Sequence, residues 1–149
     1  MIWTEVEAAA VTAGVRVGAG VVIRAPDGTP LAVLGRAVSS GSRQEALYRA
    51  ILAALLRARR MGVRAVRLSV DDADLTGQLC GRRDIPPALI GLYLQARALL
   101  NAYRRREVRR LETPSAAALE AARRALEGEE ASDGEDEAES LPLWRLVAR

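Results

Sequence analysis

Much of the fold can be predicted outward from one stretch, Leu68-Ser69-Val70-Asp71-Asp72-Ala73-Asp74-Leu75. Its first residues end a segment, 64–70, in which apolar and polar side chains alternate imperfectly, as in a strand. The acids then stand between this strand and a short predicted helix, 72–79, which ends before Gly81. Either Asp71 or Asp72 would be enough to cap that helix. The group of acids, with Asp74, therefore exceeds what local structure needs.

An amphipathic helix precedes this strand. Ser42-Arg43-Gln44-Glu45 has the spacing of a capping box, in which the serine and the glutamate side chains bond to backbone amides at the helix start. A helix that ends at Gly62 and is followed by a strand is typical of a crossover between parallel strands. Apolar residues recur at helical intervals up to Met61: Leu47, Ile51, Ala54, Leu55 and Ala58.

Three antiparallel strands are predicted before this helix. Residues 2–11 and 15–24 form a hairpin through Thr12-Ala13-Gly14. Pro26-Asp27-Gly28-Thr29 is a turn, because proline presets φ and glycine tolerates positive φ, and it leads into a third strand at 30–38.

The C-terminal part predicts helices, one basic strand and an acidic segment. Pro86-Pro87 opens a long helix that runs to about residue 100, and Thr113-Pro114 begins a final helix that ends at residue 126. A last strand is expected at 106–111. The predicted organisation is one domain at 1–126, an acidic linker at 127–140 and an apolar peptide at 141–149.

The composition excludes several kinds of chemistry. The chain has 149 residues, which fit one domain, and it contains neither histidine nor lysine. Histidine-based triads, imidazole bases and Schiff-base lysines are therefore excluded, so that any catalysis would depend on carboxylates. The single cysteine, Cys80, predicts a reducing, cytoplasmic compartment, and no apolar run is long enough for a membrane span.

The net charge of +3 conceals an asymmetry along the chain. Eight acids and no base lie between Glu127 and Ser140, whereas residues 1–126 hold 20 arginines and 11 acids, a net charge of +9. A domain of this charge is suited to a polyanion, although runs of charge most often form a solvated face. Aromatic residues are few, which argues against a base-stacking platform. The arginines expected to contact nucleic acid are Arg57, Arg60, Arg105 and Arg109.

The order of these elements resembles the ribonuclease H-like superfamily, in particular compact type I ribonuclease H and reverse-transcriptase-like ribonuclease H domains. Gly18-Ala19-Gly20-Val21-Val22-Ile23 is similar to the second strand of that family, and the segment 42–55 is similar to its first helix. The stretch 68–75 is similar to its fourth strand, which ends in a catalytic aspartate. The resemblance implies an α/β fold with a five-stranded mixed sheet, three antiparallel strands followed by parallel crossovers, flanked by helices.

The resemblance also implies a carboxylate site that binds Mg²⁺ or Mn²⁺ and cleaves the RNA strand of an RNA–DNA hybrid. It assigns Glu7, Glu45 and Asp71 as catalytic metal ligands, with Glu5 as the substitute for Glu7. Glu7 stands where the family has aspartate, and the family's last acid falls at Ala117. From the residues alone, Glu45 is better explained as a capping-box partner, and only the resemblance makes the metal-binding explanation equal to it.

Two functions therefore stay open at the level of sequence. The first is a divergent metal-dependent endoribonuclease that acts on RNA–DNA hybrids. The second is a catalytically degenerate module that binds nucleic acid, as hybrid or duplex, or a protein partner. A C-terminal cluster, Leu143, Trp144 and Leu146, is expected to dock either on its own domain or on that partner.

Overall fold

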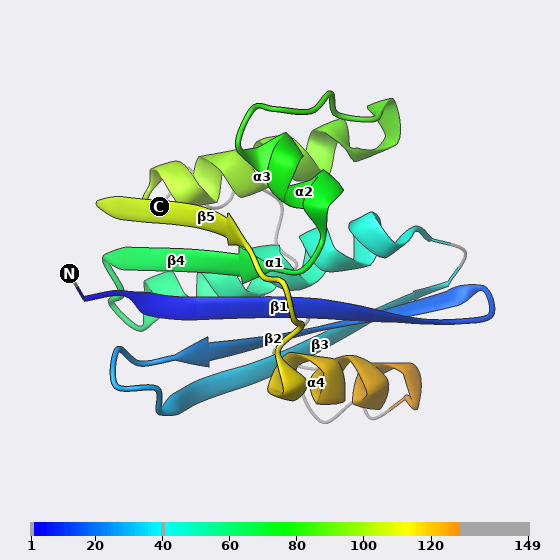
Figure 1. Ribbon diagram of the computed structural model, residues 1–149, viewed down its shortest axis with the longest axis horizontal. Coiled ribbons are helices and arrows are strands. Elements are labelled where there is room, and N and C mark those ends of the chain that lie inside the picture. Colours follow the sequence, from blue (N-terminus) through cyan, green and yellow to red (C-terminus); the bar gives the residue numbers. More distant parts are fainter. Residues whose placement is uncertain (1, 40, 129–149) are drawn as a thin grey trace.

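Five strands form one mixed sheet in the order β3-β2-β1-β4-β5, with helices on both faces (Figure 1). The computed structural model describes residues 2–39 and 41–128. The strands are β1 (Thr4–Ala13), β2 (Arg16–Arg24), β3 (Pro30–Ser39), β4 (Ala65–Val70) and β5 (Arg105–Arg110). The helices are α1 (Arg43–Arg60), α2 (Ala73–Leu79), a 3-10 turn η1 (Pro87–Leu89), α3 (Ile90–Asn101) and α4 (Ala116–Leu126).

The pairing of the strands confirms the predicted fold class. β1 pairs antiparallel with β2, and β2 pairs antiparallel with β3. On its other side β1 pairs parallel with β4, and β4 pairs parallel with β5. The helix α1 makes the crossover from β3 to β4 that Gly62 and the following strand predicted.

Alternation along β1 assigns its side chains to two faces. Val6, Ala8 and Ala10 are buried in the main core together with the apolar side of α1, including Leu47 and Ile51. The residues between them, among them Glu5 and Glu7, point to the opposite face of the sheet because side chains alternate along a strand. The core therefore lies between the sheet and α1, and the acids of β1 lie outside it.

The helix α4 covers part of that opposite face through very small residues. A Cβ atom at Gly20 would lie 2.2 Å from the carbonyl oxygen of Ala118, and one at Gly18 would lie 2.4 Å from that of Ala122. Glycines in β2 thus allow the backbone of α4 to approach the sheet closely. Figure 1 shows α4 over β1, β2 and β3, and no helix of the described residues covers β4 and β5 on this same face.

Three predicted boundaries need correction. The first hairpin turns at Gly14-Val15 instead of Thr12-Ala13-Gly14, because Thr12 and Ala13 still pair with Val17 and Arg16 of β2. The final helix begins at Ala116 instead of Thr113-Pro114, because the Ser115 side chain accepts a hydrogen bond of 3.2 Å from the Ala118 amide and caps the helix. The last strand begins at Arg105, one residue earlier than expected, because its amide donates to the carbonyl of Arg64. The expected capping by Ser42 is confirmed, with 3.0 Å from its Oγ to the Glu45 amide.

The predicted C-terminal apolar peptide, 141–149, and nearly all of the acidic linker lie outside the described residues. Leu143, Trp144 and Leu146 belong to this part, and their docking stays a prediction. None of the helices within residues 2–39 and 41–128 has the length and apolar character that a membrane crossing requires.

Two buried tyrosines attach helices to the core. The Tyr48 hydroxyl donates to Gln78 Oε1 at 2.7 Å, and the Tyr103 hydroxyl donates to the carbonyl of Leu55. Burial raises the pKa of both phenols above the ordinary value of 10.0, because the charged phenolate would be removed from water.

Because the pKa values of these two phenols are raised, we expect the free energy of unfolding to fall in alkaline solution. Above about pH 10 the unfolded chain loses phenolic protons that the folded chain retains, so stability is full below that pH and falls as the pH rises. We expect a loss of up to about 1.4 kcal/mol per pH unit for each tyrosine. Urea titrations at several pH values between 8 and 11.5 (about one-half unit apart) would measure it. Tyr48→Phe should make the decline shallower; an equal decline in the variant would contradict this assignment.

Candidate functional site

The carboxyl ends of β1 and β4 meet the beginnings of α1 and α2 at one end of the sheet. We call this place the carboxylate corner and define it by Ala10, Arg43, Asp71 and Asp72. Both strands run parallel, so that their C-terminal ends lie side by side. The acids at the end of β4 are thereby brought next to the start of α1, as the resemblance implied.

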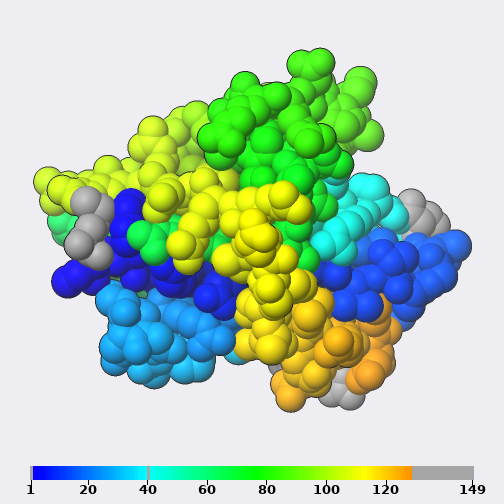
Figure 2. Space-filling view, viewed as in Figure 1, coloured from blue at the N-terminus to red at the C-terminus, as the bar shows by residue number. Residues whose placement is uncertain are grey.

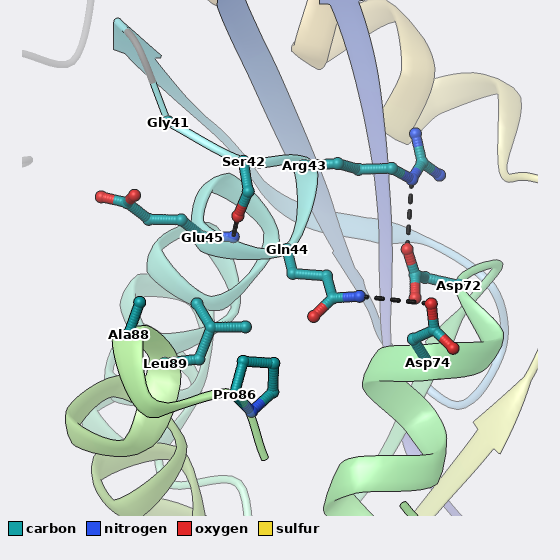
Figure 3. A pocket seen from close by; sticks show the side chains of 10 residues that line it. All are labelled: Gly41, Ser42, Arg43, Gln44, Glu45, Asp72, Asp74, Pro86, Ala88 and Leu89. Carbon is teal, nitrogen blue, oxygen red and sulfur yellow. Dashed lines mark hydrogen bonds and ion pairs between the residues drawn. The ribbon is translucent and has the colours of Figure 1, made fainter. Parts of the chain in front are cut away.

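An arginine side chain occupies the middle of this corner. Arg43 donates from Nη1 to the Ala10 carbonyl at 2.9 Å and from Nη2 to both Asp71 carboxylate oxygens at 3.3 Å. Its Nε donates to Asp72 Oδ2 at 3.2 Å, the contact drawn in Figure 3. The Asp71 and Asp72 side chains are only 13% and 10% exposed. The guanidinium group therefore supplies the positive charge that these half-enclosed carboxylates need.

Asp72 has a structural task in addition. Its Oδ1 accepts a hydrogen bond of 2.8 Å from the Leu75 amide and so caps α2. One of its oxygens thus serves the helix and the other faces Arg43. The capping explanation that the sequence offered applies to Asp72, and Asp71 is the acid left for another function.

Glu7 lies short of the corner. It is opposite Ser69 in the β1–β4 register, two residues before the level of Asp71, which is about 6.6 Å along a strand. Its carboxylate pairs instead with Arg24 of β2, at 3.3 Å. On the same face of β1, the residue that reaches the level of Asp71 is Ala9, which is buried.

Glu45 points away from the corner. It is two residues after Arg43 in α1, and therefore about 200° around the helix from it. Its carboxylate pairs with Arg49 at 3.1 Å. Figure 3 shows Glu45 directed away from Asp72 and Asp74, whereas Arg43 extends toward them. The residue one turn after Arg43 on the corner side of α1 is Leu47, which is fully buried.

The predicted metal ligands thus do not converge. Glu7, Glu45 and Asp71 are paired with three different arginines. Within residues 2–39 and 41–128, no group of three or more histidine, cysteine, aspartate or glutamate side chains is placed to hold a metal ion. Two Mg²⁺ ions need carboxylates that share them, and these residues do not fit that requirement. Glu5 is no substitute, because it pairs with Arg67 at 3.0 Å.

A cleft of about 580 Å³ adjoins the corner (Figure 3). It lies between the start of α1, the start of α2 and the segment around η1, with Pro86 and Leu89 on its far side. Gln44 donates to Asp74 across it at 3.4 Å, and Asp74 pairs with Arg83. The polar groups at its mouth thus bond mainly to one another.

Most of the predicted nucleic-acid-binding arginines lie at the other end of the sheet. The C-terminal ends of α1 and α3, joined by the bond from Tyr103 to Leu55, lie there beside the starts of β4 and β5 (Figure 1). This basic end contains Arg57, Arg60 and Arg105 together with Arg59, Arg64, Arg104 and Arg106. Arg109 lies apart from it, on the sheet face that carries Glu5, where it donates to Ser69 Oγ at 3.0 Å.

The sequence matches a family model described as reverse transcriptase-like over residues 5–112. The chain belongs to this reverse transcriptase-like family. The matched range begins in β1 and ends just after β5, so that it contains the whole sheet. No curated protein matches the chain by sequence.

Solved structures place the fold of this reverse transcriptase-like chain in the ribonuclease H-like superfamily. The N-terminal RNase H domain of a Mycobacterium tuberculosis protein is 25% identical, with a TM-score of 0.74 over 87% of this chain and 99% of that one. RNase H1 from the archaeon Halobacterium salinarum is 26% identical, with a TM-score of 0.72 over 83% and 98%. LC11-RNase H1, solved in complex with an RNA/DNA hybrid, has a TM-score of 0.69 at 17% identity over 83% and 99%.

Sequence reasoning missed the role of Arg43 in this reverse transcriptase-like chain. The capping box directed attention to Glu45, although a count of one helical turn shows that Arg43 and Leu47 share a side of α1. Likewise, in the parallel pairing of β1 with β4, Ala9 and not Glu7 is level with Asp71, which follows the last residue of β4. The residues were visible in the sequence, but which of them lie beside Asp71 depends on the register of the strands, and only the sheet provides that register.

Proposed function

We propose that the chain is a non-catalytic ribonuclease H-like module that binds nucleic acid through its arginines. The observation that supports this best is Arg43, which bonds to Asp71, Asp72 and the Ala10 carbonyl at the place where the resemblance implies metal ions. The guanidinium of Arg43 belongs to the chain itself, offsets one of the two negative charges and takes up oxygens that a metal ion would use. The chain then keeps the shape of the fold without the means to activate a water molecule by metal.

The distribution of charge supports binding to a phosphate backbone. Residues 46–70 and 85–106 contain ten arginines and no acid. Both segments reach the basic end, in which Arg57, Arg60 and Arg105 lie. LC11-RNase H1 binds an RNA/DNA hybrid, and a structural relative from foamy virus was solved with double-stranded DNA (12% identity, TM-score 0.60). We propose a hybrid or another duplex as the partner, contacted through its phosphates. Arg109 would contribute less than the other arginines, because it donates to Ser69 and pairs with Glu5.

A cleavage assay tests the non-catalytic half of the proposal. The full chain is incubated with a labelled RNA–DNA hybrid and Mg²⁺ or Mn²⁺, beside the variant Asp71→Asn. We expect the two proteins to give equal, background cleavage, because Arg43 occupies the carboxylate oxygens that a metal ion would need. Cleavage by the native chain that Asp71→Asn abolishes would overturn the proposal and establish the alternative, a divergent endoribonuclease.

A binding assay tests the other half. Four arginine–phosphate contacts predict a slope of log affinity against log salt of roughly −3.6, about a hundredfold weaker binding at 200 mM than at 50 mM salt. Fluorescence anisotropy with a labelled hybrid would measure it. The double variant Arg57→Ala/Arg60→Ala should reduce the slope by about 2. The control is Arg123→Ala/Arg124→Ala on α4, which removes the same charge from side chains 55% and 65% exposed. A flat salt response would contradict binding through arginines.

A further inference from the structure

The basic end contains a second feature, an open cleft of about 650 Å³ lined by Trp3, Arg104, Arg105 and Arg106. The tryptophan comes from the N-terminus and the arginines from the start of β5, about a hundred residues later in the chain. Figure 2 shows the N-terminal residues in blue next to the yellow-green residues at the start of β5. We call this hollow the Trp3 cleft.

The sheet register explains how the cleft forms. Thr4 is opposite Val66, so Trp3, one residue earlier, reaches the level of Ala65, and Ala65 is opposite Arg105. Trp3, Ala65 and Arg105 therefore stand in one row across three strands. Ala65 has only a methyl side chain, so the surface is low between Trp3 and Arg105, whose backbones are two strand spacings, roughly 9.6 Å, apart.

The indole ring is held in a fixed position. The guanidinium carbon of Arg67 lies 5.0 Å from the centroid of the Trp3 ring. Arg67 is itself fixed by Glu5 at 3.0 Å and by Glu107 at 2.7 Å. The ring is thus stacked on one side by a cation that two acids orient, and it lines the cleft together with Arg104, Arg105 and Arg106. An aromatic ring beside several arginines is the combination that recognises an unpaired nucleotide.

We propose that the Trp3 cleft binds a single-stranded segment of nucleic acid, one base stacking on Trp3 while the arginines at the start of β5 contact the neighbouring phosphates. This inference rests on the proposed function and adds a single-stranded segment, bound in the Trp3 cleft, to the duplex that the basic end contacts. A duplex does not present a free base face, because its bases already stack on one another. Trp3 lies seven residues before Ala10 of the carboxylate corner, about 23 Å along the strand direction, so that binding in the cleft is independent of Asp71.

The experiment uses Trp3 as its own probe. The 149-residue chain has two tryptophans, so Trp144→Phe in this chain leaves Trp3 as its sole indole. This protein is titrated with an oligodeoxythymidine of about ten nucleotides and with a blunt duplex of the same length. We expect the single strand to quench the Trp3 fluorescence and the duplex to leave it nearly unchanged. In anisotropy, Trp3→Ala should weaken single-strand binding about tenfold and duplex binding less than twofold.

Two further variants distinguish the loss of the stacking surface from a loss of folded structure. Trp3→Phe keeps a smaller stacking surface and should recover part of the single-strand affinity. Ile2→Ala changes the adjacent residue, 72% exposed, and should leave binding unchanged. If the single strand binds without quenching Trp3, or binds equally to Trp3→Ala, the inference fails while the proposed function stands. If neither single strand nor duplex binds, both fail.

Discussion

Replacement of Gly20 by valine should destabilise the domain by about 3 kcal/mol or more, because the new side chain has no space under α4. A Cβ atom there would lie 2.2 Å from the Ala118 carbonyl oxygen and 2.5 Å from the Ala122 amide nitrogen. Both are backbone atoms of a helix, which cannot turn aside as a flexible side chain would. The whole of α4 would have to move away from β2, and its buried alanines would lose their contact with the sheet.

Urea unfolding followed by circular dichroism would measure this change. The matched control is Gly91→Ala, since Gly91 lies in α3 with no atom within 4 Å of an added Cβ. Alanine has the higher helix propensity, so this variant should gain up to about 1 kcal/mol. A Gly20→Val protein as stable as the native chain would mean that α4 does not pack on the sheet in solution.

Replacement of Arg43 by methionine should destabilise the domain by about 2 kcal/mol. The change keeps much of the apolar length of the side chain but removes the donors to Asp71, Asp72 and the Ala10 carbonyl. Hydrogen bonds to charged groups contribute about 1.5 to 3 kcal/mol each, and the sum is reduced here because the Arg43 side chain is 37% exposed. The two carboxylates would also repel each other without the cation between them.

The variant Arg43→Met should also respond to divalent cations. The freed oxygens of Asp71, Asp72 and Ala10 are of the type that Mg²⁺ and Mn²⁺ prefer, and binding to the folded state alone raises its melting temperature. We expect millimolar Mn²⁺ to raise the melting temperature of Arg43→Met and to leave that of the native protein unchanged. Thermal denaturation with and without Mn²⁺ and a chelator would measure both.

A matched arginine gives the control for this second prediction. Arg49 pairs with Glu45 on the outer side of α1, where the two side chains are 50% and 32% exposed. Arg49→Met should change stability by less than about 0.5 kcal/mol and should confer no response to Mn²⁺. An Arg43→Met protein with native stability and no response to Mn²⁺ would show that the corner does not depend on this cation.

The amino-acid sequence by itself determined the order and type of the elements. The capping by Ser42, the helical spacing up to Met61 and the glycine turn that follows are local signals, which act between residues a few positions apart. The same holds for the hairpin of β1 and β2 and for the aspartates that end β4. Such features are readable because each depends on nearby backbone groups, whose geometry the local residues fix.

Only the tertiary structure decided which side chains meet. Shifting a strand by one residue moves every side chain to the other face, and two residues move it about 6.6 Å along the sheet. The β1–β4 register therefore placed Ala9 instead of Glu7 beside Asp71, and the turn of α1 directed Arg43 instead of Glu45 into the corner. The same register brought Trp3 into line with Arg105. These pairings join residues far apart in the chain, and they are set by packing across the whole sheet, which no local pattern contains.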